Sequence, residues 1–91
     1  MQLSGQITVT TAGTAVTGPD TAGARQIAIK AHPDNSDTVW LGNVSGDVAN
    51  TNGFPLDPGE GVIIAGDVTN LLSWYFDADV NGEKICWAVL A

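Results

Sequence analysis

The sequence predicts a single all-β domain, either an antiparallel β-sandwich or a small β-barrel of about seven or eight strands. Apolar residues recur at every second position along the chain, which is typical of strands with one buried face. Clusters of Gly, Pro, Asn and Asp interrupt these runs at intervals of roughly 8–12 residues, as turns do in small β domains. No segment has the apolar spacing of an amphipathic helix.

The N-terminal segment fits this pattern least clearly. Leu3, Ile7 and Val9 alternate with polar residues, and a second short strand is predicted over residues 14–17. A turn follows at Gly18-Pro19-Asp20. Residues 1–20 are therefore expected to form either a first hairpin or an N-terminal arm of the domain.

The middle of the chain contains two strands with well-defined faces. Between residues 24 and 31, Ile27 and Ile29 share one face with Ala31. Residues 38–43 form the next strand, with Val39 and Leu41 on one face and Trp40 on the other. We expect residues 44–59 to be mostly loop because they are rich in Gly, Pro and Asn.

The remaining strands follow this loop. Residues 60–65 are predicted to form a strand, and Asp67 is placed to cap one helical turn ending at Leu71. Residues 73–80 and 83–90 each alternate, with Trp74, Phe76, Ala78 and Val80 facing inward in the first, and Ile85, Trp87 and Val89 in the second. Between them, Asn81-Gly82 predicts a two-residue type I′ hairpin.

Length and charge restrict the function. The 91 residues suffice for one domain, spanning 1–91, and the formal net charge is −7. This charge repels phosphate groups, so we expect neither nucleic acid nor an anionic membrane surface as a partner. Cys86 is the single cysteine and excludes an internal disulfide. From the sequence we expect neither a secretion signal nor a membrane-spanning segment.

The residues that carry enzyme chemistry are few and scattered. His32 is the single histidine and lies at a proline turn, and Cys86 lies within an apolar strand. The segment 77–82 imitates the start of a calcium loop, but Ala88 occupies the position of the required bidentate Glu. We therefore predict no catalytic residues, no metal site and no cofactor, and expect a protein that is not an enzyme.

Five residues are candidates for an interface. Trp40 and Tyr75 have the opposite parity to the buried residues around them, and Phe54, Pro55 and Leu56 lie in the predicted loop. Apolar residues in such places either cap the open end of a β domain or form an interaction patch. The sequence alone leaves both readings open.

Two motifs carry a resemblance to a known class of proteins. Residues 35–42 read N-x-x-T-V-aromatic-aliphatic-G, and residues 51–60 read T-N-G-F-P-L-x-P-G-E. Followed by an apolar strand, a D-x-x-N-L segment and Asn81-Gly82, this order resembles small virion proteins of tailed bacteriophages. The resemblance covers roughly residues 24–91, and its motifs specify turns and packing more than function.

The resemblance implies a head decoration, or cement, protein that is located in the virion and made in the bacterial cytoplasm. Such proteins are often homotrimers and stabilise the shell by binding the major capsid protein. In this reading Leu56 plugs one end of the core. The main alternative is a binding module of a tail fibre or spike, with Trp40, Tyr75 and Phe54 stacking on host glycans. A third is a small β-barrel enzyme or metal site.

Overall fold

Eight strands and one short 3₁₀ helix make up the part of the protein that the computed structural model describes, residues 3–42 and 53–91. Within those residues no helix has the length and apolar character that a membrane span requires. The elements are β1 (Ser4–Val9), β2 (Val16–Thr17), β3 (Ala24–Ala31), β4 (Val39–Gly42), β5 (Phe54–Leu56), β6 (Gly61–Thr69), η1 (Leu71–Ser73), β7 (Tyr75–Ala78) and β8 (Glu83–Val89).

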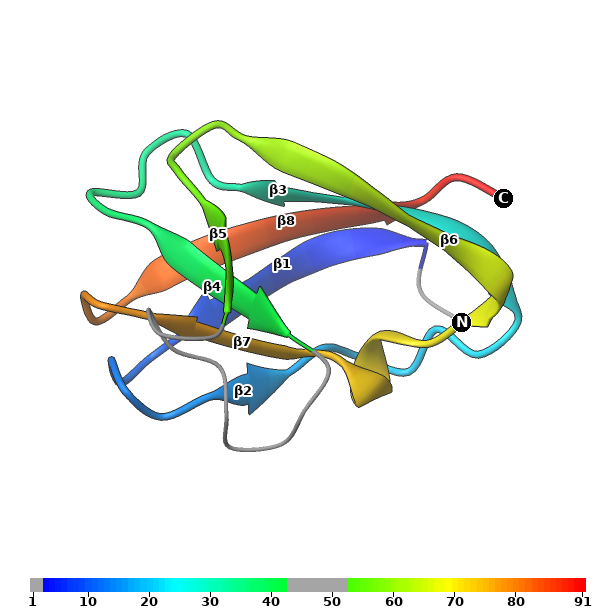
Figure 1. The fold of residues 1–91 in the computed structure, drawn as a ribbon, viewed down its shortest axis with the longest axis horizontal. Helices are drawn as coiled ribbons and strands as arrows, with labels where there is room; N and C mark the ends of the chain where they lie inside the picture. The colour runs from blue at the N-terminus through cyan, green and yellow to red at the C-terminus, as the bar shows by residue number, and fades with distance from the viewer. Residues whose placement is uncertain (1–2, 43–52) are drawn as a thin grey trace.

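The strands form two four-stranded sheets packed against each other (Figure 1). The first sheet has the order β1-β8-β3-β6, and the second has the order β2-β7-β4-β5. Every strand pair is antiparallel. The predicted all-β antiparallel architecture is therefore confirmed, and it is the sandwich rather than the barrel. One open side of the sandwich is bordered by edge strands β1 and β2, and the other by β5 and β6.

The core lies between the sheets and is built from alternate strand residues. In β3, Ile27 and Ile29 are buried while Lys30 is exposed. This alternation confirms the predicted inward faces of β3, β4 and β8, because apolar side chains of both sheets meet between them. The largest fully buried apolar side chains are Phe76, Ile27, Ile29, Leu71, Ile85, Val9 and Val39.

The predicted hairpin at Asn81-Gly82 is wrong. β7 belongs to the second sheet and β8 to the first, so the chain crosses between sheets at this turn. A type I′ turn needs a positive φ at both central residues, and here only Gly82 has one, at 84°. The side chain of Asn81 instead accepts a hydrogen bond from the Ala12 N–H at 2.7 Å. Val80 is exposed at this crossing rather than inward.

The N-terminal segment is neither a hairpin nor an arm. Residues 4–9 pair with β8 from Ser4↔Ala88 to Val9↔Glu83, which makes β1 an integral edge strand of the first sheet. β2 pairs with β7 in the second sheet. The chain therefore crosses the sandwich between β1 and β2, as it does again between β7 and β8.

The predicted helical turn is displaced along the chain. β6 continues to Thr69, and η1 begins only after Asn70. The N-cap of this turn is Asn70 and not the predicted residue 67, and the Asn70 side chain accepts a hydrogen bond from the Leu72 N–H at 3.0 Å. Asn is as good an N-cap as Asp, and because β6 is longer than predicted, position 67 lies within the strand and the cap falls at Asn70.

Part of the predicted loop 44–59 is a strand. Residues 44–52 lie outside the described residues, whereas Phe54–Leu56 forms β5 and pairs with β4. Pro55 has no N–H to give to a ladder, but β5 is the last strand of its sheet, so its outer side needs no donor. A proline in the sequence therefore marks an edge strand here, not the end of pairing.

Candidate interaction surfaces

Two buried carboxylates hold loops in place. Asp77 Oδ1 accepts hydrogen bonds from the N–H groups of Gly13, at 3.0 Å, and Ala78, at 2.7 Å. Glu83 accepts from two backbone N–H groups of the β3–β4 turn, at 3.2 and 2.9 Å, one to each oxygen. Charge-assisted bonds of this kind satisfy a carboxylate that is removed from water. Both acids thus have a structural role in positioning turns.

His32 and Cys86, the remaining candidates for enzyme chemistry, each contact a neighbouring residue. His32 Nδ1 accepts a hydrogen bond from the Asp34 N–H at 3.0 Å. Cys86 is half-buried on the outer face of the first sheet, where Gln6 Nε2 lies 3.9 Å from its sulfur. Among the described residues, no group of three or more His, Cys, Asp or Glu side chains is placed to hold a metal ion.

Strand alternation divides the five interface candidates between two faces. Trp40 lies opposite Pro55 on one neighbouring strand and opposite Asp77 on the other. Tyr75 is two residues from Asp77 along β7 and therefore shares its face. These residues lie on the outer face of the second sheet, because Phe76 and the neighbours of Trp40 point into the core. Trp40 and Tyr75 are both half-buried.

Phe54 and Leu56 point to the opposite face. They pair with Leu41 and Val39, which are buried between the sheets. Leu56 is only 2% exposed and belongs to the core, so it offers no surface to a partner. Phe54 is 55% exposed because β5 is an edge strand and no further strand covers it. Of this pair, only Phe54 remains a candidate contact.

Phe54 borders an apolar groove of about 320 Å³ between β5 and β6. Ile63, which the sequence analysis did not single out, lies beside it and is 61% exposed. The available signal was the run 62–64, where a strand with one exposed face should carry a polar residue at the centre. The residues that line the groove are all uncharged: Leu41, Phe54, Val62, Ile63, Ile64 and Trp74.

The outer edge of β6 is open. The Ala31 N–H donates to the Glu60 carbonyl at 2.8 Å, which fixes the phase of the β3–β6 ladder. In that phase the backbone groups of Val62 and Ile64 bond to β3, while those of Ile63 point away from the sheet. Residues 61–66 of β6 carry no charge, and an uncharged stretch with free backbone groups on one edge is a template for pairing with another chain.

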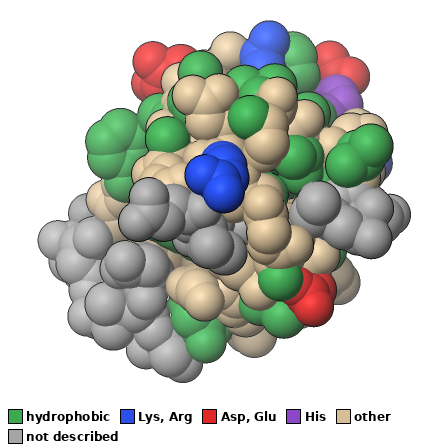
Figure 2. All heavy atoms as spheres, turned by 90° about the vertical axis from the view of Figure 1, so that its right-hand side faces the viewer, with side chains coloured by type: hydrophobic (Ala, Val, Ile, Leu, Met, Phe, Trp, Pro, Cys, Tyr) green, Lys and Arg blue, Asp and Glu red, His purple; other side chains and the backbone are tan. Residues whose placement is uncertain are grey.

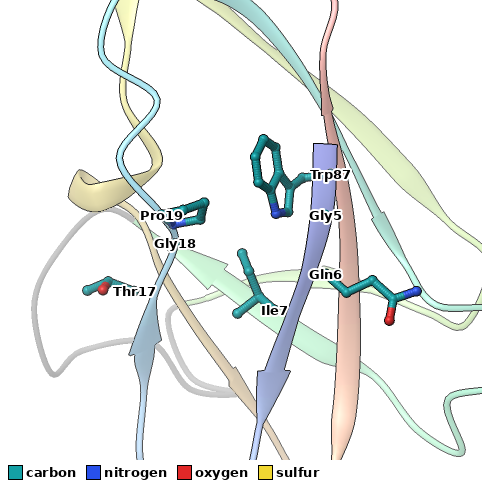
Figure 3. Close-up of a pocket in the computed structure, with 7 residues that line it drawn as sticks. All are labelled: Gly5, Gln6, Ile7, Thr17, Gly18, Pro19 and Trp87. Carbon is teal, nitrogen blue, oxygen red and sulfur yellow. The ribbon is translucent and has the colours of Figure 1, made fainter. Parts of the chain in front are cut away.

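The opposite side of the sandwich has a different character. Between β1 and β2 lies a pocket of about 310 Å³ (Figure 3). The Trp87 ring projects from β8 past Gly5 into this space. A Cβ added at Gly5 would lie 3.2 Å from the indole Nε1, so glycine leaves the indole edge accessible. The lining residues are Gly5, Gln6, Ile7, Thr17, Gly18, Pro19 and Trp87.

Apolar residues are also exposed where β1 begins, β8 ends and η1 lies. These are Leu3, Leu72 and Leu90. In the view onto this end of the molecule, the hydrophobic side chains are dispersed among polar and charged ones (Figure 2). Single exposed apolar residues are normal on protein surfaces, so we assign no function to this end.

Comparisons of the chain with protein-family models, with curated proteins and with solved structures found no match. Function is therefore inferred from the surfaces described above and from the sequence resemblance.

Proposed function

We propose that this chain is a structural protein of a tailed-phage virion, namely a head decoration protein that binds the major capsid protein and acts without catalysis. The resemblance of residues 24–91 to such proteins supports this proposal. The structural observation that carries it is the apolar side bordered by β5 and β6, where Phe54 and Ile63 are 55% and 61% exposed. Exposed apolar residues grouped in this way are typical of association surfaces.

The resemblance and this surface involve the same residues. The motif P-L-x-P-G-E contributes Pro55 and Leu56 to β5, and Gly59 turns the chain with a φ of 86°. Glu60 stabilises this turn by accepting a hydrogen bond from the Asp57 N–H at 2.9 Å. The motif therefore sets the relative position of β5 and β6, the two strands that border the apolar groove.

We assign the β5–β6 side to contacts between copies of the chain. Each copy has a net charge of −7, so association requires surfaces without further acidic groups. Residues 54–56 and 61–66 meet that condition because none is charged. A homotrimer is the arrangement typical of the resembled proteins, and in it each copy would bury its groove against a neighbour.

The trimer would stabilise a capsid by repeating many weak contacts over the shell. The test is sedimentation of the purified protein with cognate capsids that lack it. We expect saturable binding at a fixed ratio to the major capsid protein. Phe54→Ser should weaken capsid binding about tenfold. It removes a side chain from the contact between copies, and a dissociated trimer loses the avidity of binding through several copies at once. Leu90→Ser, an exposed apolar residue elsewhere, is the matched control. An absence of saturable binding would overturn the proposal.

The alternative function is glycan binding in a tail fibre or spike. It would use the outer face of the second sheet, where Trp40 and Tyr75 are both near Asp77. Both aromatic side chains are half-buried, and Asp77 Oδ1 is occupied by backbone donors. We therefore favour the capsid role. Specific hits on a glycan array that are lost in Trp40→Ala would favour the alternative instead.

A further inference from the structure

We infer that the pocket between β1 and β2 is a docking site for an extended polypeptide segment of a partner protein. The segment would pair with the open edge of β1 as an additional strand of the first sheet. One of its small apolar side chains would enter the pocket, where the Trp87 indole N–H would bind a carbonyl oxygen of the same segment. This inference does not depend on the proposed capsid role.

The outer edge of β1 has free backbone groups. The Val89 N–H donates to the Leu3 carbonyl at 2.7 Å, so odd-numbered residues of this strand face β8. The backbone groups of Ser4, Gln6 and Thr8 therefore point away from β8. β1 is the first strand of its sheet, and it contains neither charge nor proline to block an added strand.

The pocket also contains a hydrogen-bond donor, the Trp87 indole N–H. Trp87 is 96% buried, since its exposure is 4%. Within the described ranges, no residue accepts a hydrogen bond from its Nε1, which lies on the pocket side of the ring (Figure 3). Among the described residues, the indole nitrogen that is buried without a partner belongs to Trp40, whereas the Trp87 N–H opens onto the pocket and can bind an acceptor from another molecule. A peptide carbonyl of an added strand is an acceptor of the right kind at the right edge.

The pocket is preformed. Its far wall is the segment of Gly18 and Pro19, held by hydrogen bonds from the Gly18 N–H to the carbonyls of Leu71, at 3.1 Å, and Trp74, at 3.3 Å. A Cβ at Gly18 would lie 2.6 Å from the Leu71 Cβ, so this wall packs closely on η1. Because the pocket walls are already ordered, binding a ligand there costs little conformational entropy of the protein.

The geometry also selects the occupant. An added strand must direct a free apolar side chain inward, between the two sheets. β1 of a second copy has none to offer, because Ile7 and Val9 are buried in its own core. A flexible segment with alternating small apolar residues can supply one. Since the chain carries a net charge of −7, the segment is neutral or basic rather than acidic.

The experiment uses a library of random twelve-residue peptides selected on the intact protein. We expect enrichment of neutral or basic peptides with small apolar residues at alternate positions. Gln6→Pro removes one edge N–H without removing a bond to β8, and it should lower peptide affinity about tenfold. Gln6→Thr retains that N–H and is the matched control, which should bind like the wild type.

Nuclear magnetic resonance of the wild type provides a readout that needs no variant. Bound peptide should shift the Trp87 indole N–H resonance and the amide resonances of Ser4, Gln6 and Thr8. Failure to enrich any peptide would overturn the inference. So would a selected peptide that binds Gln6→Pro as tightly as the wild type, or that leaves these resonances unmoved. None of these outcomes bears on capsid binding by the β5–β6 side.

Discussion

The two open sides of the sandwich differ in how they leave strand edges unprotected. On the β5–β6 side, Pro55 blocks one edge, and the groove beside it is apolar, with Phe54 and Ile63 exposed. On the β1–β2 side, the edge is polar but uncharged, and the pocket contains an indole N–H donor next to Gly5. The first side is suited to a preformed apolar surface, and the second to an extended chain.

This comparison shows that a few side chains determine which kind of partner an exposed sheet edge can bind. Both sides have the same architecture, two sheet edges facing each other across the core. Apolar side chains gain free energy from any complementary apolar surface, whereas free backbone groups need a partner strand in register. Substitutions and hydrogen exchange on each side can test this difference.

The largest effect is expected within β5 itself. Leu56 and Phe54 lie on the same face, but Leu56 is 2% exposed and Phe54 55%. Leu56→Ala should lower the free energy of unfolding by about 2–5 kcal/mol, because it leaves a cavity. Phe54→Ala should change it by less than about 0.5 kcal/mol. Urea denaturation measures both. Similar losses in the two variants would mean that Phe54 is a core residue and not a contact residue.

A smaller effect is expected at the wall of the β1–β2 pocket. Gly18→Ala introduces a Cβ 2.6 Å from the Leu71 Cβ and 2.9 Å from the Leu71 carbonyl oxygen. We expect a loss of about 1–3 kcal/mol from overpacking. The exposed neighbour Thr17 serves as control, since Thr17→Ala should be nearly neutral. If thermal or urea unfolding shows Gly18→Ala to be neutral, the wall is not fixed and the pocket is not preformed.

The smallest expected effect is a difference in hydrogen-exchange rate between alternate backbone amides of β1. It is measured in the wild-type protein and involves no change in global stability. Amide hydrogen exchange in the free protein should be slow at Gly5 and Ile7, whose N–H groups face β8. It should be fast at Gln6 and Thr8, whose N–H groups face the open edge. Uniform protection along the strand would show that the edge is already covered, for example by another copy.

Local patterns in the sequence predicted strands well and their pairing poorly. Alternation identified the buried faces of β3, β4 and β8, because the period of two follows directly from strand geometry. The hairpin at Asn81-Gly82 failed because the Asn81 side chain is used by the N–H of Ala12, 69 positions away along the chain. No local pattern contains such a contact.

The candidate surfaces show the same limit. Phe54 was identified from its place in a predicted loop, although it lies in a strand and is exposed because that strand is an edge. Ile63 and the Trp87 pocket were missed. Both depend on which strands end a sheet, and that is a property of the assembled topology. The resemblance specified turns such as the one at Gly59, but it did not specify edges.

We propose above that the β5–β6 side joins copies of this chain. The most direct measurement is the solution mass by light scattering during size-exclusion chromatography. We predict a trimer of about three times 9.4 kDa, which Ile63→Lys converts to a monomer because it places a charge on the open edge. A wild-type protein that stays monomeric at high micromolar concentration would contradict the claim, as would a trimer that Ile63→Lys leaves intact.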